Sequence, residues 1–154
     1  MKMNVILAAT ALSAIATTAV SGDYQVTRTL QLSAPSFEVW RVIGDFCDID
    51  DWHPGVTDCE LKVIDGRLNR VLTTGDGGRF QEQRIATEAG LSYTYRIVDS
   101  PLQVARYAAT LSVEPGDGAR VTWSASFSSD DPEMEGVVAG LIEAGLAGIE
   151  SALQ

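Results

Sequence analysis

Five short connectors rich in turn-forming residues divide residues 58–128 into six segments with the character of β-strands. The segments cover residues 58–64, 68–74, 79–88, 91–98, 104–113 and 120–128. The connectors contain Asp-Gly, Ala-Gly, Ser-Pro and Gly-Asp-Gly sequences, which are typical of hairpin turns and short loops. Because such short connectors cannot cross over a sheet, neighbouring strands must run antiparallel. The sequence therefore predicts an antiparallel sheet.

The flanking segments complete an α+β pattern. Residues 25–32 alternate apolar and polar side chains and predict a strand before the other six. Two short helices follow it, one over residues 37–43 that ends at Gly44 and one over about residues 45–52. From Pro132 onward, apolar residues recur at helical spacing over about five turns. A twisted sheet can curl around this long helix, so the space between them is the natural ligand cavity.

The C-terminal helix carries four glycines, and each costs up to ~1 kcal/mol relative to alanine. These are Gly136, Gly140, Gly145 and Gly148. They reflect either sequence drift or close approach of the backbone to a sheet or ligand. Leu141 and Leu146 lie on the apolar stripe of the helix and are expected to face the sheet. If Leu141 is fully buried, Leu141→Ala should cost ~2–5 kcal/mol.

Strand alternation predicts which side chains face the C-terminal helix. The inward sets are Phe80, Glu82 and Arg84; Tyr93, Tyr95 and Ile97; Tyr107, Ala109, Leu111 and Val113; and Val121, Trp123, Ala125 and Phe127. Glu82 stands out, because a buried carboxylate needs a partner or a shifted pKa. Arg84 and the hydroxyls of Tyr93 and Tyr95 are the candidate partners. Glu82 is either a ligand anchor, an acid–base group or an internal structural contact.

Several runs of residues resemble a known superfamily. They are Val39-Trp40-Arg41-Val42-Ile43-Gly44-Asp45-Phe46, Asp51-Trp52-His53-Pro54, Cys59, Asp76-Gly77-Gly78, Tyr93-Thr94-Tyr95-Arg96-Ile97, Ser100-Pro101-Leu102 and Val121-Thr122-Trp123. Together they resemble the START-like (SRPBCC, helix-grip) superfamily, and most closely its bacterial polyketide cyclase/dehydrase-like proteins. The resemblance covers the chain from about Tyr24 to the C-terminus.

This resemblance implies a helix-grip fold. In that fold a curved antiparallel seven-stranded sheet wraps around a long C-terminal helix, and two short helices follow the first strand. The resemblance also implies that the loops over residues 74–79 and 99–104 flank the cavity mouth and act as gates. The superfamily includes lipid carriers, hormone receptors and cyclases, so it indicates a fold more than an activity.

An aromatic wall suits a hydrophobic small molecule such as a lipid or polyketide, although the same side chains could form plain core. The predicted ligand-binding residues are Trp52, His53, Phe80, Glu82, Tyr93, Tyr95, Tyr107, Trp123 and Leu141. If the protein is instead a cyclase/dehydrase-type enzyme, His53 and Glu82 are its acid–base candidates. His53 could equally hydrogen-bond its own loop or pack beside Trp52. A third possibility is a periplasmic accessory module that binds a partner protein. Arg70 and Arg106 are expected on the surface, with no assigned role.

Residues 1–22 predict a secretory signal peptide, which leaves a single domain over residues 23–154. Lys2 precedes an uncharged apolar run, and small residues follow it near Ser21 and Gly22. The protein is therefore expected to be periplasmic or secreted, without stable membrane insertion after cleavage. In such an oxidising compartment Cys47 and Cys59 should form a disulfide that contributes roughly 3 kcal/mol. The alternative is two buried free thiols.

Charge and composition exclude other classes of function. The chain has 21 acidic and 11 basic residues, a net charge of −10, which argues against a nucleic-acid partner. One histidine and two cysteines exclude multi-ligand zinc sites and iron–sulfur clusters. The acidic run Asp45, Asp48, Asp50 and Asp51 lacks the spacing of an EF-hand. We expect neither a metal nor a cofactor.

Overall fold

The computed structural model describes residues 21–154, so the predicted signal peptide lies outside the described residues apart from its last two positions. The elements in chain order are β1 (Gly22–Leu32), α1 (Ser36–Ile43), α2 (Ile49–Trp52), β2 (Val56–Ile64), β3 (Arg67–Thr74), β4 (Arg79–Glu88), β5 (Ser92–Asp99), β6 (Ala105–Gly116), β7 (Gly118–Ser129) and α3 (Met134–Ala152).

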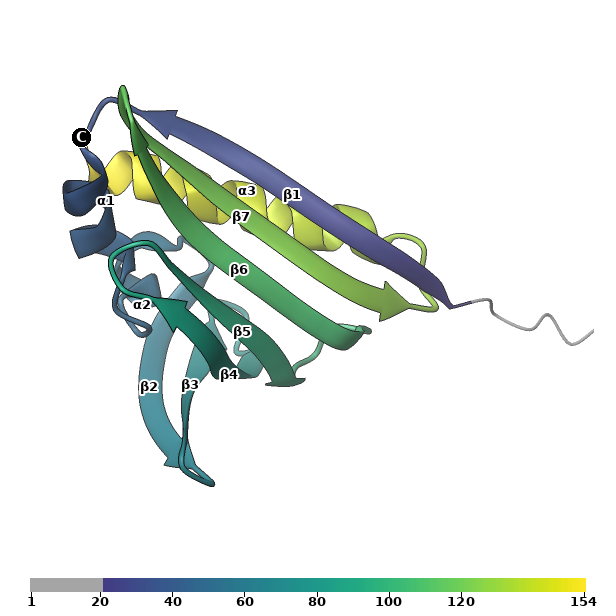
Figure 1. Cartoon of the computed structure of the whole chain (residues 1–154). Coiled ribbons are helices and arrows are strands. Elements are labelled where there is room, and N and C mark those ends of the chain that lie inside the picture. The colour runs from purple at the N-terminus through teal and green to yellow at the C-terminus, as the bar shows by residue number, and fades with distance from the viewer. Residues whose placement is uncertain (1–20) are drawn as a thin grey trace, which may run out of the picture.

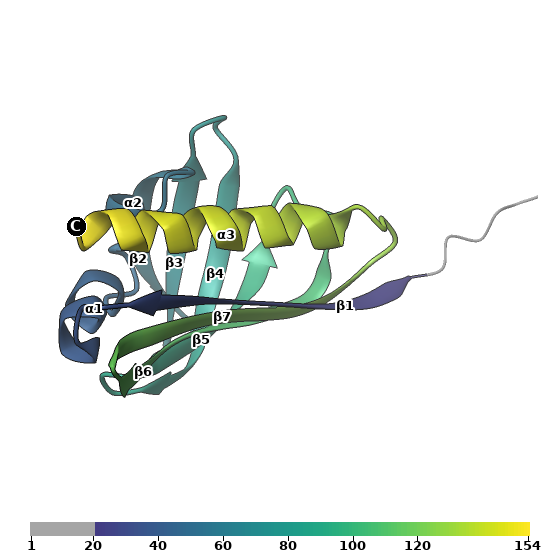
Figure 2. The ribbon, with the colours of Figure 1, turned by 90° about the horizontal axis from the view of Figure 1, so that it is seen from above.

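The strands form one seven-stranded sheet in the order β1-β7-β6-β5-β4-β3-β2, and every neighbouring pair is antiparallel. The sheet curves strongly, and α3 runs across its concave side (Figures 1 and 2). This architecture confirms the predicted helix-grip fold. Within the described residues, no helix is long and apolar enough to cross a membrane.

Among the predicted boundaries that differ from the structure, two have a clear local reason. The second helix begins only at Ile49. The Asp45 carboxylate accepts a hydrogen bond from the backbone N–H of Cys47, which holds this segment as a turn. The loop predicted between β6 and β7 is almost entirely strand, with Pro115 paired to Ala119 and Gly116 to Gly118. Gly118 permits this tight turn because its φ is 83°.

The predicted inward faces of β5, β6 and β7 are confirmed by burial. Apart from the half-buried Ile97, their side chains are buried, together with Val138, Ile142, Leu146 and Ile149 of α3. The prediction for Leu141 was wrong, since this side chain is 39% exposed and Val137, one turn earlier, is 42% exposed. α3 packs mainly on β1 and also touches β7, α1 and α2, whereas Leu141 borders a cavity rather than a packed surface. The expected large cost of Leu141→Ala therefore does not apply.

Candidate functional site

The C-terminal half of α3 closely approaches the end of α2. A Cβ atom at Gly148 would collide with the backbone carbonyl of Trp52, and one at Gly145 would lie 2.5 Å from Trp123 and 2.8 Å from His53. At Gly136 and Gly140 an added Cβ would meet nothing within 4 Å. Close approach thus explains Gly145 and Gly148 but not the other two glycines.

This contact positions His53 between a loop and a helix. The backbone N–H of Gly55 donates to His53 Nδ1 at 3.1 Å, so Nδ1 is an acceptor and Nε2 carries the proton. Nε2 donates to the carbonyl of Leu141 at 3.0 Å. Burial lowers the pKa of His53, and the nearby Arg70 charge lowers it further. His53 therefore ties the α2–β2 loop to α3 as a neutral ring with both nitrogens occupied.

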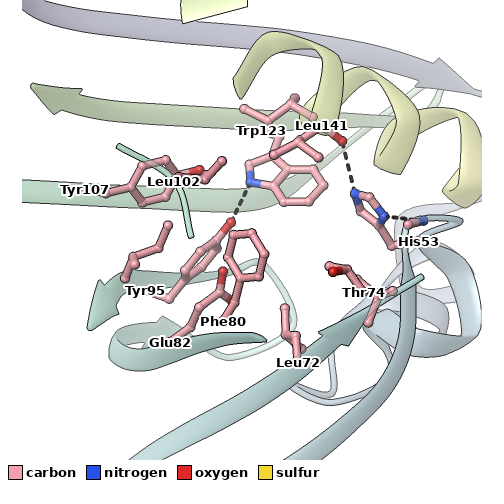
Figure 3. Close-up of a pocket in the computed structure, with 14 residues that line it drawn as sticks. His53, Leu72, Thr74, Phe80, Glu82, Tyr95, Leu102, Tyr107, Trp123 and Leu141 are labelled. Atoms are coloured by element: carbon pink, nitrogen blue, oxygen red, sulfur yellow. Dashed lines mark hydrogen bonds between the residues drawn. The ribbon is translucent and has the colours of Figure 1, made fainter. Parts of the chain in front are cut away.

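A cavity of about 80 Å³ lies beside this histidine, between α3 and the middle of the sheet (Figure 3). Its lining is mostly apolar and comprises His53, Gly55, Val56, Leu72, Thr74, Phe80, Glu82, Tyr95, Ile97, Leu102, Tyr107, Trp123, Leu141 and Ile142. An apolar cavity of about 150 Å³ accommodates benzene, so this one holds only a few non-hydrogen atoms unless it widens.

Seven of the nine predicted ligand-binding residues border this cavity. They are His53, Phe80, Glu82, Tyr95, Tyr107, Trp123 and Leu141. Trp52 and Tyr93 are buried elsewhere in the core, where Trp52 packs edge-on against Trp123 and Tyr93 against Phe46. Thr74 and Leu102, from the two loops expected at the mouth, also line the cavity.

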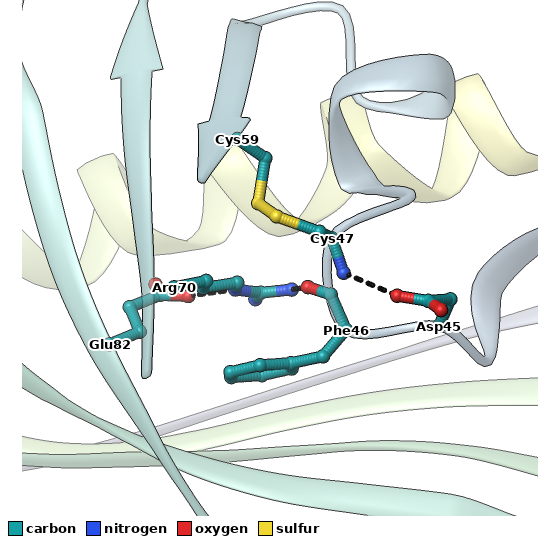
Figure 4. The surroundings of a disulfide bond; sticks show 6 residues. All are labelled: Asp45, Phe46, Cys47, Cys59, Arg70 and Glu82. Carbon is teal, nitrogen blue, oxygen red and sulfur yellow. Dashed lines mark hydrogen bonds and ion pairs between the residues drawn. A yellow bond between two sulfur atoms is a disulfide. The ribbon is translucent and has the colours of Figure 1, made fainter. Parts of the chain in front are cut away.

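The partner of Glu82 is Arg70, not the predicted Arg84 or tyrosines. Arg70 Nε donates to Glu82 Oε2 at 2.6 Å, and Arg70 Nη1 donates to the Phe46 carbonyl at 2.7 Å (Figure 4). The placement of Arg70 on the surface was wrong, because its side chain is 0% exposed. Burial acts to lower the pKa of Arg70, but its interactions with surrounding groups, first among them the Glu82 carboxylate, together raise it, so the guanidinium stays charged. Arg106, as expected, is exposed.

Aromatic rings surround the Arg70 guanidinium. Its Cζ lies 4.2 Å from the ring centre of Phe46 and 4.9 Å from that of Tyr95, within the range of cation–π attraction. Alternation along β3 could have indicated this position, since Arg70 shares a face with Leu68 and Leu72. The buried ion pair therefore lies beside the cavity: Glu82 borders it and Arg70 does not.

The tyrosine hydroxyls near the cavity remain protonated at neutral pH. Tyr95 accepts a hydrogen bond from Trp123 Nε1 at 3.2 Å. Burial raises the pKa of Tyr95 well above its usual value, and Tyr107 and Glu82 raise it further. The pKa of Tyr107 is also raised, first by burial and then by Glu82. These hydroxyls can donate or accept hydrogen bonds but do not act as phenolate bases.

The predicted disulfide is present between Cys47 and Cys59, with Cα atoms 5.5 Å apart (Figure 4). It joins the turn before α2 to β2. Cys47 directly follows Phe46, whose carbonyl binds Arg70, so the bridge and the buried ion pair hold the same segment.

The acidic run does not assemble a metal site in the described part of the chain. Residues 21–154 contain no group of three or more His, Cys, Asp or Glu side chains suited to a metal ion. Partial burial raises the pKa of Asp48, and the charges of Asp45, Asp51 and Asp50 raise it further.

Comparisons with known proteins agree with this architecture. A family model described as "Polyketide cyclase / dehydrase and lipid transport" matches residues 23–154. The solved structure of the protein XoxI from Bacillus cereus is 27% identical, with a TM-score of 0.77 over 83% of this chain and 94% of that one. No curated protein sequence matches the chain.

Two more distant structures share the fold. The Zhui aromatase/cyclase from a Streptomyces species is 18% identical, with a TM-score of 0.72 over 85% of this chain and 93% of that one. Norcoclaurine synthase from Thalictrum flavum, solved with dopamine and hydroxybenzaldehyde, is 18% identical, with a TM-score of 0.64 over 86% of this chain and 87% of that one. At this identity the likeness concerns the fold alone.

Proposed function

The chain belongs to the polyketide cyclase/dehydrase and lipid transport family, and on this premise we propose that it is an exported binding protein for a small apolar or aromatic molecule. The ligand would lie between the sheet and α3. The observation that carries this proposal is the largely apolar cavity into which a single carboxylate, Glu82, projects. Such a lining suits a ligand with an apolar body and one hydrogen-bond donor.

The cavity volume limits the ligand. In about 80 Å³ only part of a single ring or the end of a chain fits. A larger molecule requires movement at Thr74 or Leu102, which belong to the two loops beside the cavity. These loops meet, since an added Cβ at Gly78 would lie 3.6 Å from Pro101. We assign them the role of gates.

Binding fits the contacts better than acid–base catalysis does. His53 uses both ring nitrogens in structural hydrogen bonds, and one oxygen of Glu82 is held by Arg70. Burial keeps Tyr95 and Tyr107 protonated. A general acid or base must exchange a proton with its substrate, and each of these candidates is already engaged or unable to ionise at neutral pH.

Export rests on the sequence of the N-terminus and is supported by the disulfide, a bond that persists in oxidising compartments. β1 begins at Gly22, so cleavage near this residue leaves the domain intact. Intact mass of the protein recovered outside the cytoplasm should show loss of about 19 to 22 residues. Recovery of the uncleaved chain in soluble form would contradict export by this route.

Ligand binding is tested with p-cresol as a single-ring probe, by calorimetry, beside mass spectrometry of co-purified small molecules. Leu141→Ala removes a side chain that lines the cavity, whereas Val137→Ala removes a similarly exposed one a turn away that does not. We expect Leu141→Ala, which both removes an apolar contact and enlarges the cavity, to change p-cresol affinity several-fold and Val137→Ala to leave it unchanged. Equal effects of the two variants, or no apolar ligand at all, contradict the proposal.

Glu82→Gln tests the polar contact. If Glu82 anchors the ligand, affinity falls about tenfold or more, because a charge-assisted hydrogen bond contributes ~1.5–3 kcal/mol. If Glu82 serves only Arg70, the free energy of unfolding falls while the affinity of the folded protein is unchanged. Calorimetry measures the affinity and denaturant titration measures the free energy of unfolding, so the two measurements together distinguish these outcomes.

A further inference from the structure

The two outer strands of the sheet, β1 and β2, differ in chemistry. An outer strand presents unpaired backbone N–H and C=O groups along its free edge. On β1 the exposed side chains opposite the α3 side are polar, as at Thr27, Thr29 and Gln31. On β2, Leu61 is 46% exposed and Val63 is 73% exposed. The β2–β3 hairpin also projects beyond the rest of the sheet (Figure 1).

The side chains of β2 sort onto two faces. Leu61 pairs with Arg70 and Val63 with Leu68 across the β2–β3 ladder, so Leu61 and Val63 point to the concave side with the buried Arg70. Glu60 and Lys62 point to the opposite side, where Lys62 Nζ lies 3.2 Å from Glu60 Oε2. The strand thus has an apolar pair on one face and an ion pair on the other.

We infer that two copies of this chain associate through β2, antiparallel about a twofold axis at Leu61. In this register Glu60 lies opposite the partner's Lys62, and Lys62 lies opposite the partner's Glu60. The four charges then alternate in sign around a square. On the concave face the two Leu61 side chains meet, and Val63 of each copy flanks them. Both free edges gain a backbone ladder, and the two sheets become one.

The charge pattern is what selects a second copy as the partner. The sequence Glu60-Leu61-Lys62 is complementary to itself only in the antiparallel register centred on Leu61. Directly opposed opposite charges stabilise a strand pair, whereas like charges destabilise it. The twofold contact uses the β2 edge of both copies, so assembly stops at the dimer. The polar β1 edge offers no equivalent apolar surface.

Sedimentation of the disulfide-bonded chain over a concentration series tests this inference, with three variants of β2 and one control variant. Lys62→Glu makes all four charges negative and should raise the dissociation constant at least tenfold. Glu60→Lys makes all four positive and should act similarly. The double variant Glu60→Lys/Lys62→Glu restores alternation and should recover dimerisation. Arg120→Glu makes the same change of charge at an exposed side chain of β7 and should leave the dissociation constant unchanged.

Two further experiments distinguish association through β2 from association through another surface. An equimolar mixture of the Lys62→Glu and Glu60→Lys chains should form heterodimers, because one edge is then wholly negative and the other wholly positive. Amide hydrogen exchange over residues 59–63 should slow as concentration rises, while β1 should be unaffected. A chain that stays monomeric at millimolar concentration overturns the inference. A dimer indifferent to these charge changes, or open-ended aggregation, overturns it as well.

Discussion

The two sides of the sheet are stabilised by different means. On the side of β1 and β7, α3 covers the strands, and the buried residues there are apolar, among them Val26, Val138 and Ile142; the ion pair between Arg28 and Glu143 lies at the exposed rim. On the side of β2, β3 and β4, a buried ion pair and a disulfide hold the turn after α1 against the strands. Among the strands, α3 packs on β1 and β7, so the side of the sheet that it leaves uncovered depends more on polar and covalent links.

The cavity lies where these two regions meet. Leu141 and Ile142 border it from α3, and Leu72, Phe80 and Glu82 border it from β3 and β4. The free space arises because the sheet curves away from the helix at this point. The following changes test whether the two regions really differ in what stabilises them.

Removing the buried cation should have the largest effect. Arg70→Met leaves Glu82 buried without its partner, so the free energy of unfolding should fall by ~3–5 kcal/mol. Urea unfolding measures this change. The double variant Arg70→Met/Glu82→Leu should recover most of the loss, because no buried charge remains. If the single variant costs less than ~1 kcal/mol, the ion pair does not stabilise this side of the sheet.

Two leucines of α3 should separate the covered face from the cavity face. Leu146 is buried, and Leu146→Ala should cost ~2–5 kcal/mol. Leu141 is 39% exposed, and Leu141→Ala should cost less than ~1 kcal/mol. Thermal and urea unfolding of both variants give the difference. Equal costs would mean that α3 is covered along its whole length, contrary to the comparison.

Loss of the disulfide should weaken the uncovered side. The bridge spans a sequence separation of 12 residues, and closing such a loop contributes roughly 3 kcal/mol in the chain-entropy picture. Cys47→Ala/Cys59→Ala should lower the free energy of unfolding accordingly. Thiol titration of the denatured, unreduced parent protein should find no free cysteine; two reactive thiols would refute the bridge.

The link between the two regions through His53 should depend on pH. Because the pKa of folded His53 is lowered by burial, the unfolded chain binds a proton first as the pH falls below about 6.5. The stability that this residue contributes is therefore present above pH 6.5 and is lost below it. The loss amounts to about 1.4 kcal/mol for each unit by which folding lowers the pKa of His53. Urea unfolding between pH 7 and 5 should show this loss, and His53→Gln should reduce the slope. An unchanged slope in the variant would exclude His53 as its source.

The smallest effect is expected at the exposed glycine of α3. Gly140→Ala adds a methyl group into open space and should stabilise the protein by up to about 1 kcal/mol. Gly148→Ala should instead destabilise it, because the new Cβ meets the Trp52 carbonyl. The melting temperatures of the two variants, each compared with that of the parent protein, measure these opposite effects. A gain in stability at both positions would show that α3 does not closely approach α2.

Local patterns in the sequence were enough to predict the sheet. Alternation and short connectors predicted seven antiparallel strands, because these features depend on neighbouring residues alone. The same alternation placed Glu82 inside, and its burial is confirmed. Applied to residues 68–72, it would also have placed Arg70 inside, but the charge of arginine argued for the surface.

Long-range packing decided the rest. Helical periodicity marks Leu141 and Leu146 alike, and only the direction in which α3 crosses the curved sheet separates them. The same crossing determines which glycines of α3 meet α2. The partner of Glu82 lies 12 residues away on the neighbouring strand, at a distance set by strand register. Cavity volume depends on how far the sheet curves away from the helix, a sum of many small twists that no single residue encodes.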